Sequence, residues 1–188
     1  MLVIGNGESR KHIDIDSIND TKIGCNAILR DYSVEHLVCV DRKMVREAIT
    51  AEYKSNIYTR EDWIEEFKAY GIMTVPELPY TGQERADHPF HWGSGPYAVL
   101  IACNLGNNIN MLGFDLHSKN QYMNNIYKDT EHYDASNKSA VDPKYWKHQI
   151  GKVIESNQHI KFIIYQSEWD IPKQWNFQNV SLDSTRNL

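Results

Sequence analysis

The sequence is poor in cysteine, carries little net charge and has no long apolar run. Its three cysteines, Cys25, Cys39 and Cys103, form no CxxC pair, so neither a zinc site nor a redox motif is indicated. Their odd number favours buried thiols in a reducing cytosol. A net charge of −5 with mixed signs argues against bulk electrostatic binding of nucleic acid.

No apolar stretch approaches the roughly 18 residues that a membrane-spanning helix needs, so we expect no transmembrane segment. The start of the chain has neither a basic region nor a long apolar region, and it therefore does not resemble a signal peptide. The chain does contain 41% hydrophobic and 11% aromatic residues, which is enough for one hydrophobic core. We therefore expect a single cytoplasmic domain over residues 1–188.

Short apolar runs alternate with longer amphipathic segments along the chain. We predict strands at residues 2–4, 22–25, 36–40, 55–58, 73–75, 109–113 and 160–165. We predict helices at residues 42–52, 60–70, 94–105 and 143–155, the last beginning after Asp142 as N-cap. This alternation predicts an α/β fold with a Rossmann-like, mainly parallel sheet and helices on both faces.

Three polar regions fall outside this pattern. Residues 79–91 and 117–142 are long for connections in a compact domain, so each is expected to be functional or mobile. The tail, residues 176–188, is expected to be loosely ordered.

Polar residues that follow the predicted strands are the first site candidates, because open parallel sheets bind ligands beyond the carboxyl ends of their strands. The first strand is followed by Gly5-Asn6-Gly7-Glu8-Ser9, whose glycines permit a tight turn and a close approach to a ligand. A purely structural turn accounts for this segment as well. Asn26 closes the second strand, where it either reads a ligand or caps a turn.

The third predicted helix begins with Ser94 and Gly95 and is mostly apolar. Free backbone N–H groups and the positive end of a helix favour an anion such as phosphate or carboxylate at this position. The structural alternative is that Ser94 is only the N-cap, with Pro96 completing the signature.

The sixth predicted strand is followed by Asp115 and by a loop that contains His117, Tyr122 and His132. Tyrosine and histidine suit sugar recognition and general acid–base catalysis, because histidine titrates near neutral pH. An ordinary polar surface loop is the alternative. A DxD sequence, Asp14-Ile15-Asp16, falls in a short amphipathic segment, so we expect no metal site.

Several of these segments occur together in a fixed order. They are Gly5-Asn6-Gly7-Glu8-Ser9, Cys25-Asn26, Ser94-Gly95-Pro96-Tyr97, Leu105-Gly106 and Gly113-Phe114-Asp115. In this combination, over roughly residues 1–165, the chain resembles the small bacterial sialyltransferases that modify surface glycans and related glycosyltransferase-like proteins. The family pattern reads GNGPS, RCN, SGxY, LG and GIDFY.

The resemblance implies a nucleotide-binding domain that transfers a sugar from a CMP-activated donor to a glycan acceptor, without a metal or other cofactor. It implies that Asn6 and Asn26 contact the nucleotide, with Gly7 and Ser9 in the same donor-binding loop. It further implies that Ser94 and Gly95 hold the phosphate or the donor carboxylate and that Asp115 lies near the nucleotide. Tyr122 lies near one of two family tyrosines that assist the leaving phosphate, and His117 replaces the other.

The chain departs from the family at several positions. Glu8 replaces a proline, Gly24 replaces an arginine, and Ser136 stands where the family has its catalytic histidine. His132 is the provisional base that deprotonates the acceptor hydroxyl, with His117 as the alternative. Ser136 and the short chain favour a second function, a catalytically inactive nucleotide-sugar-binding or structural module on the same fold. The oligomeric state stays open.

Overall fold

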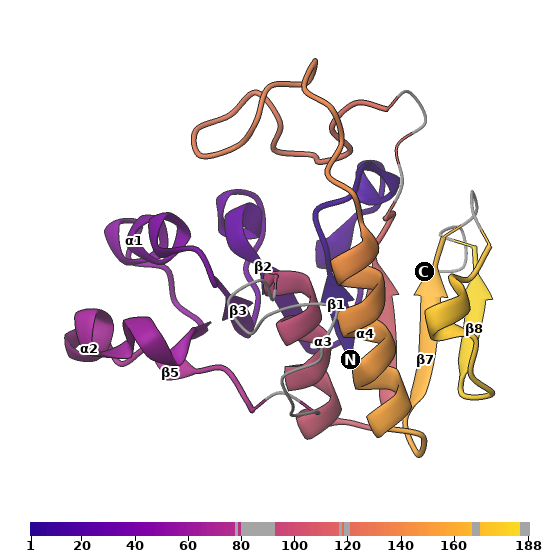
Figure 1. Cartoon of the computed structure of the whole chain (residues 1–188). Helices are drawn as coiled ribbons and strands as arrows, with labels where there is room; N and C mark the ends of the chain where they lie inside the picture. The colour runs from indigo at the N-terminus through magenta and orange to yellow at the C-terminus, as the bar shows by residue number, and fades with distance from the viewer. Residues whose placement is uncertain (78, 80–92, 117, 119–120, 167–169, 185–188) are drawn as a thin grey trace.

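The computed structural model describes residues 1–77, 79, 93–116, 118, 121–166 and 170–184. Its centre is an eight-stranded sheet in the order β5-β4-β3-β2-β1-β6-β7-β8. Every neighbouring pair in this sheet is parallel. The chain therefore has the α/β, Rossmann-like fold that the sequence predicts (Figure 1).

The strands are β1 (Leu2–Ile4), β2 (Lys22–Cys25), β3 (His36–Val38), β4 (Asn56–Thr59), β5 (Met73–Thr74), β6 (Asn108–Leu112), β7 (Lys161–Tyr165) and β8 (Val180–Asp183). The α-helices are α1 (Arg42–Thr50), α2 (Ile64–Phe67), α3 (Ser94–Leu105) and α4 (Lys144–Ser156). Short 3-10 helices are η1 (Glu8–Arg10), η2 (Ile15–Ser17), η3 (Asn26–Arg30), η4 (Glu61–Trp63), η5 (Lys68–Tyr70) and η7 (Lys173–Trp175).

Two hydrophobic cores lie on opposite faces of the sheet, because side chains alternate between the faces of a strand. On β1, Val3 packs into the core that contains α3 and α4, whereas Leu2 and Ile4 pack into the core that contains α1. All three side chains are fully buried. Burial on both faces explains why the central strands are almost continuously apolar.

Helix α3 is apolar around its whole circumference, and its residues from Tyr97 to Ala102 are buried. It contacts β1, β2, β3 and β6 on one side and α4 on another, and it reaches the surface only at its C-terminal end, where Leu105 is 48% exposed. Figure 1 shows α3 and α4 side by side in front of the sheet. This packing holds the N-terminus of α3 close to the ends of the central strands.

The strand order changes direction at β1. The chain adds β2 to β5 on one side of β1 and then returns to place β6 on the other side. In parallel sheets, a crevice opens at such a reversal, outside the carboxyl ends of the two strands. The residues that follow β1 and β6 are therefore the positions where the topology itself creates space for a ligand.

All seven predicted strands are confirmed, two with their exact bounds and five with ends shifted by one or two residues, and α3 matches its predicted range. The predicted helix at 60–70 is divided into η4, α2 and η5, and it ends at Gly71 with a φ of 68°, as expected for a glycine C-cap. β8 is an additional strand. It was not predicted because it lies at the sheet edge, where Leu182 is 39% exposed and no apolar run develops.

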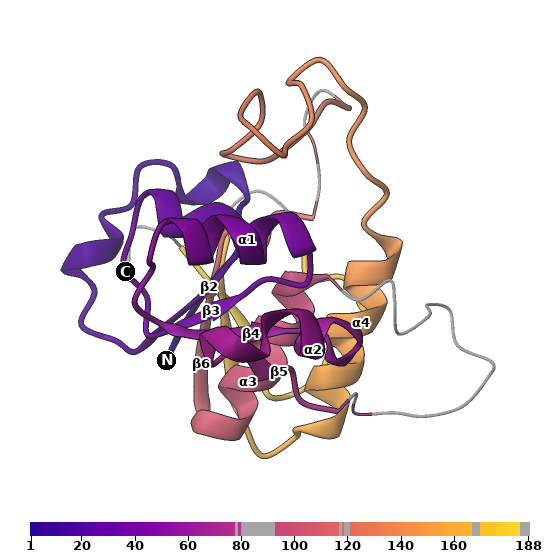
Figure 2. The ribbon, with the colours of Figure 1, turned by 90° about the vertical axis from the view of Figure 1, so that its left-hand side faces the viewer.

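Residues 121–142 form a long loop beyond one end of the sheet, and both views show it projecting past the strands (Figures 1 and 2). An antiparallel bridge between Tyr122 and Ser139 closes the base of the loop. The Ile126 backbone N–H donates a hydrogen bond of 2.9 Å to the Asn6 carbonyl, so the loop rests on the segment after β1.

Within the described residues, no helix is long and apolar enough to cross a membrane.

Candidate functional site

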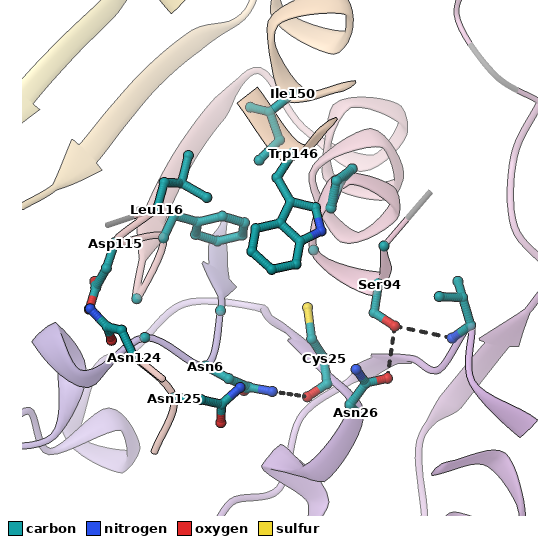
Figure 3. A pocket seen from close by; sticks show the side chains of 18 residues that line it. Asn6, Cys25, Asn26, Ser94, Asp115, Leu116, Asn124, Asn125, Trp146 and Ile150 are labelled. Atoms are coloured by element: carbon teal, nitrogen blue, oxygen red, sulfur yellow. Dashed lines mark hydrogen bonds between the residues drawn. The ribbon is translucent and has the colours of Figure 1, made fainter. Parts of the chain in front are cut away.

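A cavity of about 260 Å³ opens at the carboxyl ends of β1, β2 and β6, next to the N-terminus of α3 (Figure 3). Its walls come from segments that are far apart in the sequence. The lining residues are Gly5, Asn6, Gly7, Cys25, Asn26, Val40, Gly93, Ser94, Gly95, Pro96, Gly113, Phe114, Asp115, Leu116, Asn124, Asn125, Trp146 and Ile150. The location is the one that the strand order favours for a ligand.

The bottom of the cavity is a close contact between the backbones that leave β1 and β6. The Gly5 N–H donates to the Leu112 carbonyl at 2.8 Å, and the Gly7 N–H donates to the Gly113 carbonyl at 2.9 Å. A Cβ atom on Gly5 would lie 2.4 Å from the Gly113 carbonyl oxygen. Gly113 itself has a φ of 74°, which favours glycine. These glycines therefore permit the two strand ends to approach each other.

Asp115 holds the segment after β1 in place. Its carboxylate accepts a hydrogen bond of 3.0 Å from the Ser9 N–H and a short one from the Ser9 hydroxyl. A Cβ atom on Gly7 would lie 2.5 Å from the same carboxyl group. Asp115 is 5% exposed, and Ser9 does not line the cavity. Ser9 therefore acts on the site through Asp115, which lines it.

A second contact joins the ends of β2 and β3 to α3. The Ser94 hydroxyl donates to Asn26 Oδ1 at 2.8 Å and accepts from the Val40 N–H at 3.1 Å. Asn26 has a φ of 49°, a conformation that asparagine adopts more readily than most residues. Since its Oδ1 is engaged by Ser94, its Nδ2 is left as a donor without a hydrogen-bond acceptor among the described residues.

Asn6 is a second asparagine whose side chain lines the cavity, as that of Asn26 does. Its Nδ2 donates to the Cys25 carbonyl at 3.3 Å and to the Tyr133 hydroxyl at 3.4 Å. Its buried Oδ1 accepts no hydrogen bond from any described residue. Burial raises the pKa of Tyr133 to about 12, so this hydroxyl stays neutral at physiological pH. Burial likewise raises the pKa of Cys25 to about 12, and the thiol is not a nucleophile there.

The opposite wall is apolar and is built around Trp146 of α4. Figure 3 shows its ring projecting into the cavity, with Asn6 and Asn26 on the opposite side and Ile150 beside it. A Cβ atom on Gly93 would lie 2.9 Å from Trp146 Nε1. Trp146 neither follows a strand nor begins a helix, so the pattern that identifies the other site residues does not include it. The signal available was its spacing from Ile150, four residues later, which places both on one face of the helix.

Contacts of Arg10 and Lys128 attach the long loop to this site. Arg10 is 2% exposed, and its guanidinium donates to the Gly5 carbonyl at 2.8 Å and to the Tyr127 hydroxyl at 3.0 Å. Lys128 Nζ lies 2.7 Å from the Glu8 carboxylate. Lys128 thus neutralises the charge of Glu8, which follows Gly7 in the segment after β1.

The structure brings together six of the residues selected from the sequence. The residues that line the cavity are Asn6, Gly7, Asn26, Ser94, Gly95 and Asp115. Tyr122 is 54% exposed, and neither it nor His132 is among the lining residues. The His132 side chain lies 3.8 Å from the Glu131 carboxylate. His117 lies outside the described residues, so its assignment stays a prediction.

Comparisons of the chain with protein-family models, characterised proteins and solved structures find no match. Across the described part of the chain, no group of three or more His, Cys, Asp or Glu side chains has a geometry that could hold a metal ion.

Proposed function

We propose that the chain binds a nucleotide-activated sugar in this cavity and transfers the sugar to a glycan acceptor, as a sialyltransferase-like glycosyltransferase with a CMP-activated donor. The observation that carries the proposal is the convergence of the Asn26 amide and the start of α3 on one cavity at the reversal of the strand order. The backbone N–H groups of Ser94 and Gly95 have no acceptor within the helix, because they belong to its first turn.

The charge of the cavity supports a donor with a single phosphate. Lysine, arginine and histidine are missing from the described lining residues, and Asp115 is the ionisable acid among them. A helix N-terminus offers about half of a positive charge, which suits one phosphodiester better than the two phosphates of a nucleoside diphosphate sugar. A CMP-activated sugar has one phosphodiester.

In the transfer step, a base takes the proton of the acceptor hydroxyl, the acceptor oxygen forms a bond to the anomeric carbon of the donor sugar, and the bond from that carbon to the phosphate oxygen breaks. The phosphate leaves with the electrons of that bond and is stabilised by the α3 backbone donors. His132 and His117 are the two candidate bases. His117 directly follows Leu116, a lining residue, in the sequence, whereas the His132 side chain does not line the cavity. His117 is therefore the stronger candidate.

One observation favours the second function, a binding module without catalysis. The described lining residues include no histidine, and the carboxylate of Asp115 is already engaged by Ser9. Such a module would bind the donor in the same cavity but would not turn it over. The two functions therefore share a binding test and differ in a turnover test.

The binding test uses thermal shift and calorimetry with CMP, UDP, GDP and their sugars. A ligand at 100 times its Kd stabilises the folded state by about 2.7 kcal/mol, which a melting curve detects readily. We expect CMP and a CMP-sugar to bind more tightly than the diphosphate nucleotides. Hydrolysis or transfer of the CMP-sugar would support the enzyme, and binding without turnover would support the module. Absence of binding by every nucleotide would overturn both.

Asn26→Gly is a suitable variant, because glycine keeps the positive φ and removes the amide. Glu52→Gly is its matched control, since Glu52 has the same φ of 49° and lies exposed after α1. We expect the Asn26 variant to weaken CMP binding at least about tenfold, which corresponds to about 1.4 kcal/mol. The Glu52 variant should bind as the wild type does.

A further inference from the structure

The two walls of the cavity differ in chemistry. One wall carries the amides of Asn6 and Asn26, with an unpartnered acceptor on the first and a donor without a described partner on the second. The other wall contains Trp146, Phe114, Leu116 and Ile150. A ligand between them therefore needs an apolar face on one side and hydrogen-bonding groups on the other.

The position of the indole is set by its surroundings. Gly93 has no side chain, and any Cβ there would meet Trp146 Nε1 at 2.9 Å. Gly95 has none either, and a Cβ there would meet the Phe114 ring at 3.3 Å. The two glycines on either side of Ser94 therefore let both aromatic residues reach the start of α3. No described residue accepts a hydrogen bond from Trp146 Nε1.

From this arrangement we infer that Trp146 is the stacking surface for the nucleobase of the bound nucleotide. The inference rests on the proposed function and specifies which part of the donor each wall contacts. A nucleobase is a planar ring with apolar faces and a polar edge, so its face suits the indole and its edge suits the amides. Ribose and the transferred sugar carry hydroxyl groups on most carbons, and an apolar wall would leave these groups without partners.

The first experiment follows tryptophan fluorescence during titration of the wild-type protein with cytidine, CMP, free sialic acid and inorganic phosphate. Cytidine and CMP should quench the emission, whereas phosphate and the free sugar should not. Trp63→Phe is the matched control, because Trp63 does not line the cavity and lies under the guanidinium of Arg60 at 4.7 Å. This variant should keep the quenching in full. In Trp146→Phe the quenching should largely disappear.

The second experiment separates stacking from simple filling of space. Trp146→Leu keeps an apolar side chain but removes the aromatic face, and we expect a Kd for CMP that is about tenfold to hundredfold higher. Trp146→Phe should recover most of this affinity, since it keeps a ring. Thermal melting of each free variant verifies that it is folded. If the Leu variant does not fold, the quenching measured in the wild-type protein and in the Phe variant still tests the inference.

The outcomes distinguish this inference from the proposed function. If CMP binds but the Leu and Phe variants keep the wild-type affinity and quenching, the stacking assignment is wrong and the donor site stands. If free sialic acid quenches Trp146 and cytidine does not, the indole contacts the sugar and the assignment is again wrong. If no nucleotide binds the wild-type chain, the proposed function fails and this inference fails with it.

Discussion

Asn26 Oδ1 accepts a hydrogen bond of 2.8 Å from the Ser94 hydroxyl, which connects the carboxyl end of β2 to the first residue of α3. The same hydroxyl accepts a bond from the Val40 backbone N–H. Ser94 is 4% exposed, so water does not replace these contacts. The relationship explains how one serine, which a sequence pattern identifies only as a helix start, holds the orientation of an amide that lines the cavity.

Ser94→Ala should therefore destabilise the fold as well as the site. Loss of the hydroxyl leaves the Val40 N–H and Asn26 Oδ1 without their partner, which costs about 1–3 kcal/mol for a buried group. Urea unfolding measures the change in the free energy of unfolding. Ser17→Ala is the control, because the Ser17 hydroxyl bonds to the Asp14 carbonyl at 2.7 Å on the exposed surface. Equal losses in the two variants would contradict the prediction.

Gly5→Ala should be far more destabilising than Gly71→Ala. The Gly5 Cβ would lie 2.4 Å from the Gly113 carbonyl oxygen, which is backbone and has no room to move aside. We expect a loss of about 3 kcal/mol or more, or failure to fold. Gly71 has open space around it and only its φ of 68° opposes a side chain, for a cost of about 1–2 kcal/mol. Chemical denaturation of both variants ranks them, and a larger loss at Gly71 would refute the assignment.

The sequence predicts the sheet and the location of the site more completely than the site's interior. The central strands and α3 are recognisable because burial on both faces requires continuous apolar runs. Asn6, Asn26, Ser94 and Asp115 are recognisable because each follows a strand or begins a helix, and the topology makes those positions meet. The order of the strands in the sheet brings these four residues together, whereas the local sequence patterns only identify them as candidates.

Trp146 and Tyr133 could not be selected by the same reasoning. Trp146 has the spacing of an ordinary core residue on an amphipathic helix, and only the tertiary position of α4 directs it toward the cavity. Tyr133 belongs to the long polar loop, where the sequence offers no periodicity. Its contact with Asn6 depends on the anchoring of that loop by Arg10 and Lys128, which joins residues more than a hundred positions apart.

Tyr133→Phe should weaken nucleotide binding with little effect on stability. The Tyr133 hydroxyl accepts hydrogen bonds of 3.4 Å from Asn6 Nδ2 and from the Ala27 N–H, and it restricts how the Asn6 amide lies. Calorimetry with CMP should give a Kd about tenfold higher, while the long bonds imply a stability loss of about 1 kcal/mol or less. Tyr70→Phe, at a residue that is 61% exposed, is the control. Unchanged affinity in the Tyr133 variant would show that Asn6 is oriented by Cys25 alone.

Acid should destabilise the fold through His36. Burial lowers the pKa of His36 below its ordinary value, although Glu35 opposes this. The unfolded chain then binds more protons than the folded chain between the lowered pKa and about 6.5, so the free energy of unfolding rises with pH in this window and falls on acidification. Urea unfolding at several pH values should show a shallower pH dependence in His36→Gln, and NMR titration of His36 reports its pKa directly. An equal slope in both proteins would contradict this prediction.

The assignment of the base predicts different outcomes for two histidine variants. His117 follows Leu116, which lines the cavity, in the sequence, whereas the His132 side chain does not line it and lies 3.8 Å from the Glu131 carboxylate. Removal of a general base lowers turnover by about 10²–10⁴-fold and leaves donor binding intact. His117→Gln should therefore lose transfer from a CMP-sugar while keeping the wild-type Kd for CMP, and His132→Gln should keep most of the rate. The reverse pattern would assign the base to His132, and turnover that survives in both variants would show that neither histidine is the base.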